Sequence, residues 1–492
     1  MTEPGQPVSE VQVDEPRPAG RRPAHALVWS FANTAASRLG TLAIGIVLAR
    51  LLGPEEFGTY AVAYIALIAV LSFNELGVSL AIVRWPDDPR AIAPTVTTIS
   101  VVTSTLIALG VMLVAPAFAS QMGDPGATGL VQLLALCVII NGIVASPAAL
   151  LQRHFRQDRR MVIDQVNVWL GAGVSVALAL AGVGALSLVV GRLAGAIVSG
   201  VLFLAYSPER FRFGFDRQYV RPLLAFGLPL AGASVIVFAA GYVDQLVVGR
   251  VLGSVALGAY VLAFNLASWP VSMFSQPLRS VAPALFARLQ GDGAVMGETF
   301  ARVVRPLAAV ALPACAVLAA AAPEVVQFVY GAAWLPAAEP LRWLAIVAAG
   351  RILVELAYDY LVVQGRSHAL LLVQALWFAA LLPAVVVGAQ QGGLGGAGLA
   401  QVVVVGVVVL PVYLWLLARA AVRPGEVLRR LAVPVAASLV LAGLVVVVLA
   451  AVGSPLLGLL IAGALTAGVA ALLLHGARSD IALLRTTSDA VV

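Results

Sequence analysis

Apolar runs of about twenty residues recur along this chain, and they constrain its fold more than any other feature. A helix of that length spans the hydrocarbon core of a bilayer. The sequence is 61% hydrophobic and only 11% charged, whereas a soluble domain is about one quarter charged. In lipid every backbone polar group needs an internal partner, so only helices or a closed barrel can span it. Because the runs are long and do not alternate in polarity, the sequence predicts an all-α polytopic membrane protein.

Charged residues and Gly/Pro breaks separate these runs into about fourteen expected transmembrane helices. Residues 1–25 precede the first run, and their polar, Pro-rich composition predicts a disordered cytoplasmic tail. The expected spans are 26–49, 58–83, 93–117, 128–150, 163–182, 185–206, 223–247, 257–278, 303–322, 341–363, 369–388, 395–418, 431–451 and 455–475.

The distribution of arginine predicts the orientation of the bundle. Lysine is absent, so all 30 basic residues are arginine. With the N-terminus inside, 24 arginines fall in cytoplasmic segments and only Arg50, Arg250 and Arg342 lie near external ends. Cytoplasmic loops are enriched in basic residues in this way. We therefore expect a multi-pass membrane protein with both termini in the cytoplasm.

A short sequence repeats at an offset of 200 residues. Residues 50–63 read RLLGPEEFGTYAVA and residues 250–263 read RVLGSVALGAYVLA. Six expected spans separate the copies, so the two halves share one orientation, as in transporters with parallel repeats. The alternative is chance similarity between two Gly/Ala-rich hairpins. The repeat predicts an N-lobe at 26–206 (helices 1–6) and a C-lobe at 207–420 (helices 7–12), followed by helices 13 and 14 at 421–476 and a cytoplasmic tail at 477–492.

The sequence lacks the residues that several kinds of chemistry require. A Walker A loop needs a lysine, and the four histidines stand in no metal-binding motif. We therefore expect no metal, no cofactor and no catalytic residue, and the arginines flank membrane spans, so nucleic-acid binding is not expected. Glu55 and Glu56 could mimic a metal-binding pair of a membrane glycosyltransferase, but we interpret them as solvated loop carboxylates.

A few ionisable residues fall inside the expected spans. Each costs roughly 2.5–3.5 kcal/mol at the bilayer centre, so we expect all of them to face the bundle interior or water. The set is Arg38, Glu75, Arg192, Asp244, Arg351, Glu355 and Asp359.

Arg351, Glu355 and Asp359 follow one another at intervals of four residues, which places them on one helical face. We expect Arg351 to pair with Glu355 and to leave Asp359 as a spare carboxylate. The row then forms a coupling or gating site, with Glu75 and Asp244 as further candidates. The alternative is a set of interhelical salt bridges that only fix packing.

Arg38 and Arg192 have no evident partner within their own spans. A guanidinium suits phosphate oxygens, so both residues, with Asn33, are candidates to bind an anionic substrate in a central cavity. The alternative is pairing with Glu75 or Asp244. Buried amides are expected to form interhelical hydrogen bonds; they are Asn74, Asn141, Asn167, Asn265, Gln276, Gln374 and Gln401.

Three segments carry a resemblance to a known family. They are ELGVSLAIVR (75–84), YVDQLVVGRVLGSVALGAYVLAFNLASWPVSMFSQPL (242–278) and VQFVYGAAWLPAAEPLRWLA (326–345). They resemble the polysaccharide (Wzx-type) flippases, in the superfamily that also holds the MATE antiporters and the lipid II flippases. The resemblance extends over roughly residues 27–420, and helices 13 and 14 match mainly by hydropathy.

The resemblance implies two six-helix lobes around a central cavity and transport by alternating access. The implied cargo is an oligosaccharide on undecaprenyl pyrophosphate, flipped for surface polysaccharide export. Membrane lipids and a polysaccharide polymerase or glycosyltransferase are the implied partners. The two additional C-terminal helices resemble the arrangement in lipid II flippases. Alternatives are a lipid II flippase, a MATE-like cation-coupled multidrug antiporter and, from another class, a membrane glycosyltransferase.

Overall fold

The computed structural model describes residues 22–72, 77–86, 88–289, 292–480 and 482–483, with side chains from residue 43 onward apart from a few between 233 and 284. The chain divides into two units, Met1–Gly45 and Ile46–Val492. In the first unit the described residues form only the N-terminal part of helix α1 (Arg22–Leu71).

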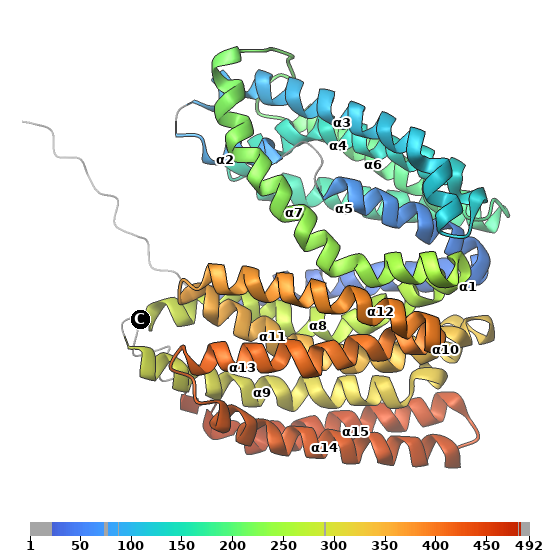
Figure 1. The fold of residues 1–492 in the computed structure, drawn as a ribbon, viewed down its shortest axis with the longest axis vertical. Coiled ribbons are helices and arrows are strands. Elements are labelled where there is room, and N and C mark those ends of the chain that lie inside the picture. The colour runs from blue at the N-terminus through green and yellow to red at the C-terminus, as the bar shows by residue number, and fades with distance from the viewer. Residues whose placement is uncertain (1–21, 73–76, 87, 290–291, 481, 484–492) are drawn as a thin grey trace, which may run out of the picture. The chain divides into compact units, whose positions relative to one another are not determined.

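The second unit is all helical, and the described residues contain no strand, so the predicted all-α class is confirmed (Figure 1). After α1 come α2 (Ser79–Arg84), α3 (Pro89–Gln121), the short η2 (Pro125–Ala127), α4 (Thr128–Arg153), α5 (Gln157–Leu180) and α6 (Leu186–Tyr206). In this N-terminal half α3 packs on α4, α5 packs on α6, and α4 also contacts α6.

The C-terminal half begins with α7 (Arg217–Leu252), α8 (Ser254–Arg288) and α9 (Gly293–Ala320). There follow α10 (Ala322–Tyr330), η3 (Ala332–Ala337), α11 (Ala338–Val363), α12 (Ser367–Val404), the π-helical turn η4 (Val405–Val409), α13 (Leu410–Ala418), α14 (Pro424–Ala451) and α15 (Pro455–Gly476). Its core lies where α11 packs on α8, α9 and α12, and it is built around the buried rings of Tyr260, Phe286, Phe300 and Tyr360.

Eleven helices of the described residues are long and apolar enough to cross a membrane, so the exact count of fourteen is not confirmed. The stretch Ser367–Ala418 counts once because its helix continues through a turn at Gly392 and Gly393, where two spans were predicted. α11 lies outside the eleven and carries the charged residues Arg342, Arg351, Glu355 and Asp359.

One predicted boundary was wrong, and one expected loop is helical. The span expected at 58–83 ends at Leu71, and a separate short helix, α2, follows. Gly77 lies two residues before α2 with a φ of +67°, which residues with a Cβ adopt only under strain. The loop expected at 322–341 contains helices, since α10 and η3 fold there and bury Trp334.

The two copies of the repeat adopt the same backbone turn. Gly53 has φ 72° and ψ 176°, and Gly253 has φ 86° and ψ 177°. Gly53 kinks α1, while Gly253 separates α7 from α8. Because only glycine enters this region readily, the identical glycine of each copy sets the same hairpin in each half.

Both repeat turns also contact the opposite half of the chain. Arg50 donates from Nε to the Val329 carbonyl at 2.7 Å and from Nη2 to the Phe328 carbonyl, both on α10. Arg250 reaches Gln121 at the end of α3, with 3.4 Å between Nη1 and Oε1. The same arginine of each repeat copy therefore bonds to the other half.

Glu56, in the first repeat turn, accepts a hydrogen bond from the Ala185 backbone N–H at 2.7 Å, at the start of α6. The carboxylate is thus bound to a helix N-terminus, where negative charge is favoured. Glu56 therefore has a structural role at the start of α6.

α7 connects the two halves by packing on both of them. Its first turns, with the buried Leu223, join Val78, Ile82 and Ile92 of α2 and α3 in one apolar cluster. Its later part packs on α12. The chain path through α7 can be followed in Figure 1.

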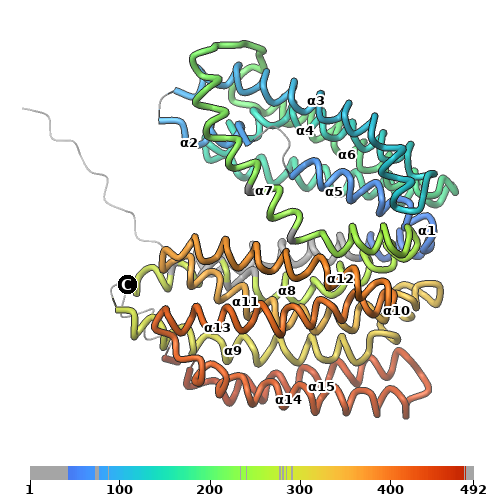
Figure 2. Tube along the Cα trace, in the orientation of Figure 1, coloured from blue at the N-terminus to red at the C-terminus, as the bar shows by residue number. Residues whose placement is uncertain are grey.

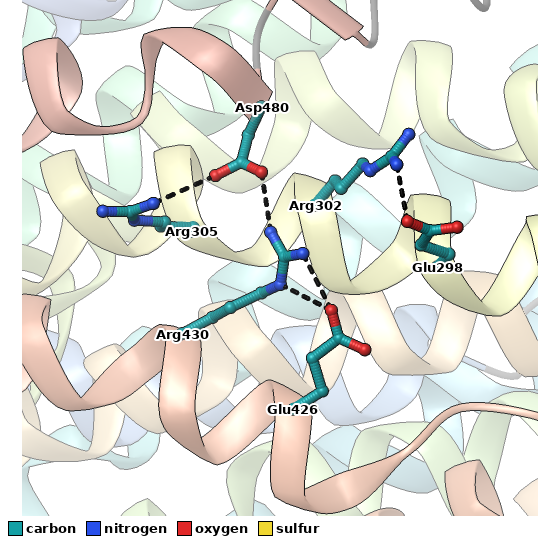
Figure 3. Close-up of polar contacts among 6 residues, drawn as sticks. All are labelled: Glu298, Arg302, Arg305, Glu426, Arg430 and Asp480. Carbon is teal, nitrogen blue, oxygen red and sulfur yellow. Dashed lines mark hydrogen bonds and ion pairs between the residues drawn. The ribbon is translucent and has the colours of Figure 1, made fainter.

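α14 and α15 lie side by side against α9 (Figure 2). At one end of this contact Asp480, just after α15, accepts hydrogen bonds from Arg430 of α14 at 2.7 Å and from Arg305 of α9 at 3.3 Å (Figure 3). Arg430 also pairs with Glu426 at 2.8 Å. One buried carboxylate therefore joins the C-terminal segment, α14 and the core helix α9.

Candidate functional site

A cavity of about 290 Å³ opens inside the N-terminal half, between α1, α2, α4, α5 and α6. Its polar lining consists of Asn141, Gln152, Arg160, Asp164, Asn167, Arg192 and two serines. A cavity with this many polar groups is suited to water or a polar ligand, because an apolar bundle would fill such a space with side chains. It is the candidate binding site of this half.

Arg192, predicted as a substrate-binding residue, lies on the wall of this cavity. Gly191 and Gly195 flank it on α6 and allow close contact with α5, since a Cβ on Gly191 would lie 2.4 Å from the Gly171 carbonyl oxygen. This small-residue packing is typical of membrane helices. The Arg192 guanidinium then lies over the Tyr64 ring, 5.9 Å from its centroid.

Among the described residues Arg192 forms no ion pair, and the alternative pairing with Asp244 is not made. Its side chain is exposed although it lies six residues into a membrane-crossing helix. A charge at that depth is tolerated where it meets water or an anion and not lipid. Arg192 therefore holds a positive charge available within the cavity.

The cavity contains a second arginine, Arg160, which lies between the expected spans 128–150 and 163–182. Arg160 donates to the Gln152 side chain at 2.8 Å and lies 3.9 Å from Asp164, four residues further on α5. The spacing of four residues was the available signal for this pair. With Arg192 and Arg160 against one carboxylate, the described lining carries a net positive charge, which suits an anionic group.

The other candidates of this half lie outside the described side chains. Asn33 and Arg38 belong to the part of α1 before residue 43, and Glu75 lies in the segment 73–76. Their proposed roles in binding and coupling therefore remain predictions.

On α11 the structure gives each carboxylate a partner. Arg351 and Glu355 lie 3.8 Å apart, so the predicted pair is confirmed, and Ser275 of α8 donates a hydrogen bond to Glu355. Asp359 was expected to be spare, and this was wrong, because Arg279 of α8 binds it at 3.1 Å. Two of these contacts join α11 to α8, and the coupling or gating role of the row stays a prediction.

Asp244 lies in a different polar cluster within the C-terminal half. Its carboxylate, only 3% exposed, accepts hydrogen bonds from Tyr260 of α8 at 3.0 Å and Gln401 of α12 at 2.6 Å. Gln401 thus forms the interhelical hydrogen bond expected of a buried amide. Among the described residues Asp244 has no cationic partner, although a buried carboxylate is costly unless it is paired, protonated or bound to a cation.

Tyr260 is one of the positions that are identical in the two copies of the repeat. Its counterpart Tyr60 stacks on Tyr64 with 5.5 Å between ring centroids, next to Arg192. The repeated tyrosine therefore lies near a cation in one half and contacts a carboxylate in the other. The two halves therefore share the repeat turn, but the charged group near the repeated tyrosine is Arg192 in one half and Asp244 in the other.

A bundle that crosses a membrane many times and keeps charged groups in its interior defines an integral membrane protein of the transporter type. The family model described as "Polysaccharide biosynthesis protein" matches residues 47–339, which is more than half of the chain. The chain belongs to this family, and the resemblance found in the sequence is confirmed.

Two curated relatives align over most of the chain. The lipopolysaccharide biosynthesis protein WzxC of Escherichia coli K12 is 23% identical over 72% of this chain and 72% of its own length. The succinoglycan biosynthesis transport protein ExoT of Rhizobium meliloti is 27% identical over 79% of each chain. The alignments thus cover most of both proteins.

Two solved structures share the fold. The lipid II flippase MurJ, in an inward closed conformation, superposes with a TM-score of 0.72 and 14% identity over 92% of this chain and 99% of that one. An inward-facing MATE family multidrug transporter of the MOP superfamily gives 0.62 and 17% identity over 78% and 94%. At such identities the likeness concerns the fold alone. The chain therefore has the MurJ/MATE fold.

Proposed function

We propose that this protein is a flippase that carries an undecaprenyl-pyrophosphate-linked oligosaccharide across the cytoplasmic membrane by alternating access, for surface polysaccharide export. Arg192 is the observation that carries the proposal, because it is an exposed guanidinium on the wall of a polar cavity inside the membrane bundle. The family supports the same cargo class, since both aligned relatives are named for polysaccharide biosynthesis. No catalytic residue is proposed.

The diphosphate of the carrier lipid is the group that Arg192 would bind. A diphosphate entering a bundle loses hydration, and a planar guanidinium replaces it with two parallel hydrogen bonds. Arg160 adds a second positive charge to the cavity. Arg38 and Asn33 remain proposed ligands on α1, and the amides Asn141 and Asn167 supply hydrogen-bonding groups suited to sugar hydroxyls.

Alternating access would move an N-lobe at 26–206 against a C-lobe at 207–420. The matching turns at Gly53 and Gly253 support two structurally equivalent halves. The arginine distribution supports an external position for these turns, with both termini in the cytoplasm of a bacterium. The segment 421–476 and the tail 477–492 lie outside the two lobes. Membrane lipids and a polysaccharide polymerase or glycosyltransferase remain the proposed partners.

Coupling to an ion gradient is assigned to Asp244. The alternatives Arg351, Glu355 and Asp359 are engaged with one another or with α8, and Glu75 stays a further candidate. Among the described residues Asp244 has no cationic partner and accepts side-chain hydrogen bonds from the neutral groups of Tyr260 and Gln401, so a proton or small cation can neutralise it. This observation also favours the second candidate function, a MATE-like cation-coupled antiporter.

A lipid II flippase is the remaining alternative, supported by the fold likeness over 92% of the chain. Its cargo has the same diphosphate, so Arg192 serves both hypotheses equally. The sugar distinguishes them, and the two relatives named for exported polysaccharides favour the oligosaccharide.

The test is transport by the purified full-length protein in liposomes, with a fluorescent oligosaccharide on undecaprenyl pyrophosphate. Lipid II and a cationic dye serve as competing cargoes. Arg192→Gln should slow flipping roughly tenfold or more, because a hydrogen bond to a charged group contributes about 1.5–3 kcal/mol. Arg342→Gln, on the exposed side of α11, is the matched control. Dye efflux without oligosaccharide flipping would reject the proposal in favour of the antiporter.

A further inference from the structure

A second cavity, of about 470 Å³, lies away from the Arg192 cavity at the arginine-rich end of the N-terminal half. It is enclosed by the first turns of α3, the last turns of α4 and the loop 207–216 between α6 and α7. Three arginines line it, Arg90, Arg210 and Arg212, against the single carboxylate of Glu209. The lining therefore has an excess of two positive charges.

The loop that carries Arg210 and Arg212 is held in place along α3. Glu209 pairs with Arg90 at 2.8 Å. Further on, Thr98 donates to the Gly214 carbonyl at 2.7 Å, and the Gly214 N–H bonds back to the Thr98 hydroxyl at 3.1 Å. Gly214 has no room for a side chain, because a Cβ would lie 2.7 Å from that of Pro94. The arginine pair thus occupies a fixed segment between two anchors.

The cavity offers polar groups that the protein itself does not use. Arg210 and Arg212 are exposed and form no ion pair with any described carboxylate. The hydroxyl of Ser207, on the same wall, is buried and has no hydrogen-bond partner among the described groups. Two free guanidiniums and a free hydroxyl form a set of donors suited to phosphate oxygens.

The depth of the loop indicates where such a phosphate comes from. The loop is bound to α3 at Arg90 and at Thr98, which are about 12 Å apart along the helix axis. Both residues lie in the first turns of this membrane-crossing helix. A helix of 33 residues is longer than the hydrocarbon core is thick, so its first turns are expected among the lipid headgroups. Phe213 and Phe215, 63% and 68% exposed, follow the two arginines in the same loop. The apolar rings suit the acyl boundary, and the guanidiniums suit the phosphates above it.

We infer that this cavity binds the phosphate headgroup of an anionic membrane lipid of the surrounding leaflet. The site is separate from the transport cavity and does not depend on which cargo is carried. Arg210, Arg212 and the Ser207 hydroxyl bind the phosphate, and the exposed phenylalanines lie among the first acyl methylenes.

The test uses the full-length protein in detergent, titrated with phosphatidylglycerol or phosphatidylcholine and read by native mass spectrometry. The double variant Arg210→Gln/Arg212→Gln should weaken phosphatidylglycerol binding about 25-fold, since each basic side chain near anionic lipid contributes about fivefold. The matched control, Arg217→Gln/Arg221→Gln, removes the same charge from exposed positions outside the cavity. It should change binding less than about twofold.

Equal weakening by both double variants would overturn the inference, because it would indicate general electrostatic attraction. So would unchanged binding in Arg210→Gln/Arg212→Gln. A parallel titration with glycerol 3-phosphate tests the source of the phosphate. Tight binding of this soluble probe with the same dependence on Arg210 and Arg212, but no effect of the variant on phosphatidylglycerol, would overturn the lipid assignment.

Discussion

Gly58 and Gly258, the same position in the two copies of the repeat, lie against each other without room for a methyl group. A Cβ on Gly258 would lie 2.8 Å from the Cα of Gly58, and a Cβ on Gly58 would lie 2.4 Å from the Ser254 carbonyl oxygen. These are backbone atoms, which cannot rotate away. The repeat therefore supplies both surfaces of a close contact between the two halves.

Substituting either glycine should weaken this contact. For Gly58→Ala and Gly258→Ala we expect a loss of about 1–3 kcal/mol in the free energy of unfolding, the usual cost of an overpacked site. Gly463→Ala, on α15 with no atom within 4 Å of the added Cβ, should be neutral or slightly stabilising. Thermal unfolding of the purified protein in detergent measures all three. Equal stability of the three variants would contradict the close contact.

The arginine of each repeat copy should contribute unequally. Arg50 bonds to two backbone carbonyls of α10, whereas Arg250 makes one long bond of 3.4 Å to Gln121. We therefore expect Arg50→Gln to lower the free energy of unfolding by about 1–2 kcal/mol more than Arg250→Gln does. The same unfolding assay compares them. A larger loss of stability in Arg250→Gln would contradict the stronger attachment of Arg50.

The hydrophobic pattern predicted the helical bundle, and the repeat predicted the matching turns at Gly53 and Gly253. Partners on different helices were harder to predict. Arg351 and Glu355 share one helix, so their spacing of four residues predicted their contact. Arg279 and Asp359 are 80 residues apart, and their contact depends on how α8 and α11 are rotated about their axes. No sequence spacing carries that information.

The same limit applies to the candidate sites. The position of Arg192 within an apolar run predicted its interior location. Its contact with Tyr64 and the cavity shared with Arg160 required the packing of α1, α5 and α6. Asp244 and Gln401 were each recognised as buried polar groups, but their bond joins residues 157 positions apart.

Neutralising Asp244 should separate transport from its driving force. Asp244→Asn keeps the size of the side chain and removes the carboxylate that a proton or cation would neutralise. We expect flipping in liposomes to lose its stimulation by an imposed proton or sodium gradient while binding of the cargo persists. Asp359→Asn serves as the comparison, because it instead leaves Arg279 without its ion-pair partner and should reduce stability. Full gradient stimulation in Asp244→Asn would place the coupling site elsewhere.

The attachment of α14 and α15 should depend on Asp480. This carboxylate, 7% exposed, binds Arg305 of α9 and Arg430 of α14, so Asp480→Asn leaves two guanidiniums without their shared partner (Figure 3). A half-buried network is more costly to break than a surface pair, and we expect a loss of about 1–3 kcal/mol in the free energy of unfolding.

Glu298→Gln is the matched control within the same view. It removes the carboxylate of the pair with Arg302, which joins residues four apart on the single helix α9 and leaves the glutamate side chain half exposed (Figure 3). Such pairs contribute about 0.3–0.5 kcal/mol. Thermal unfolding gives the two stabilities, and limited proteolysis tests whether the segment after α14 is released. If Asp480→Asn were no less stable than Glu298→Gln and no more sensitive to protease, then apolar packing alone would hold α14 and α15 on α9.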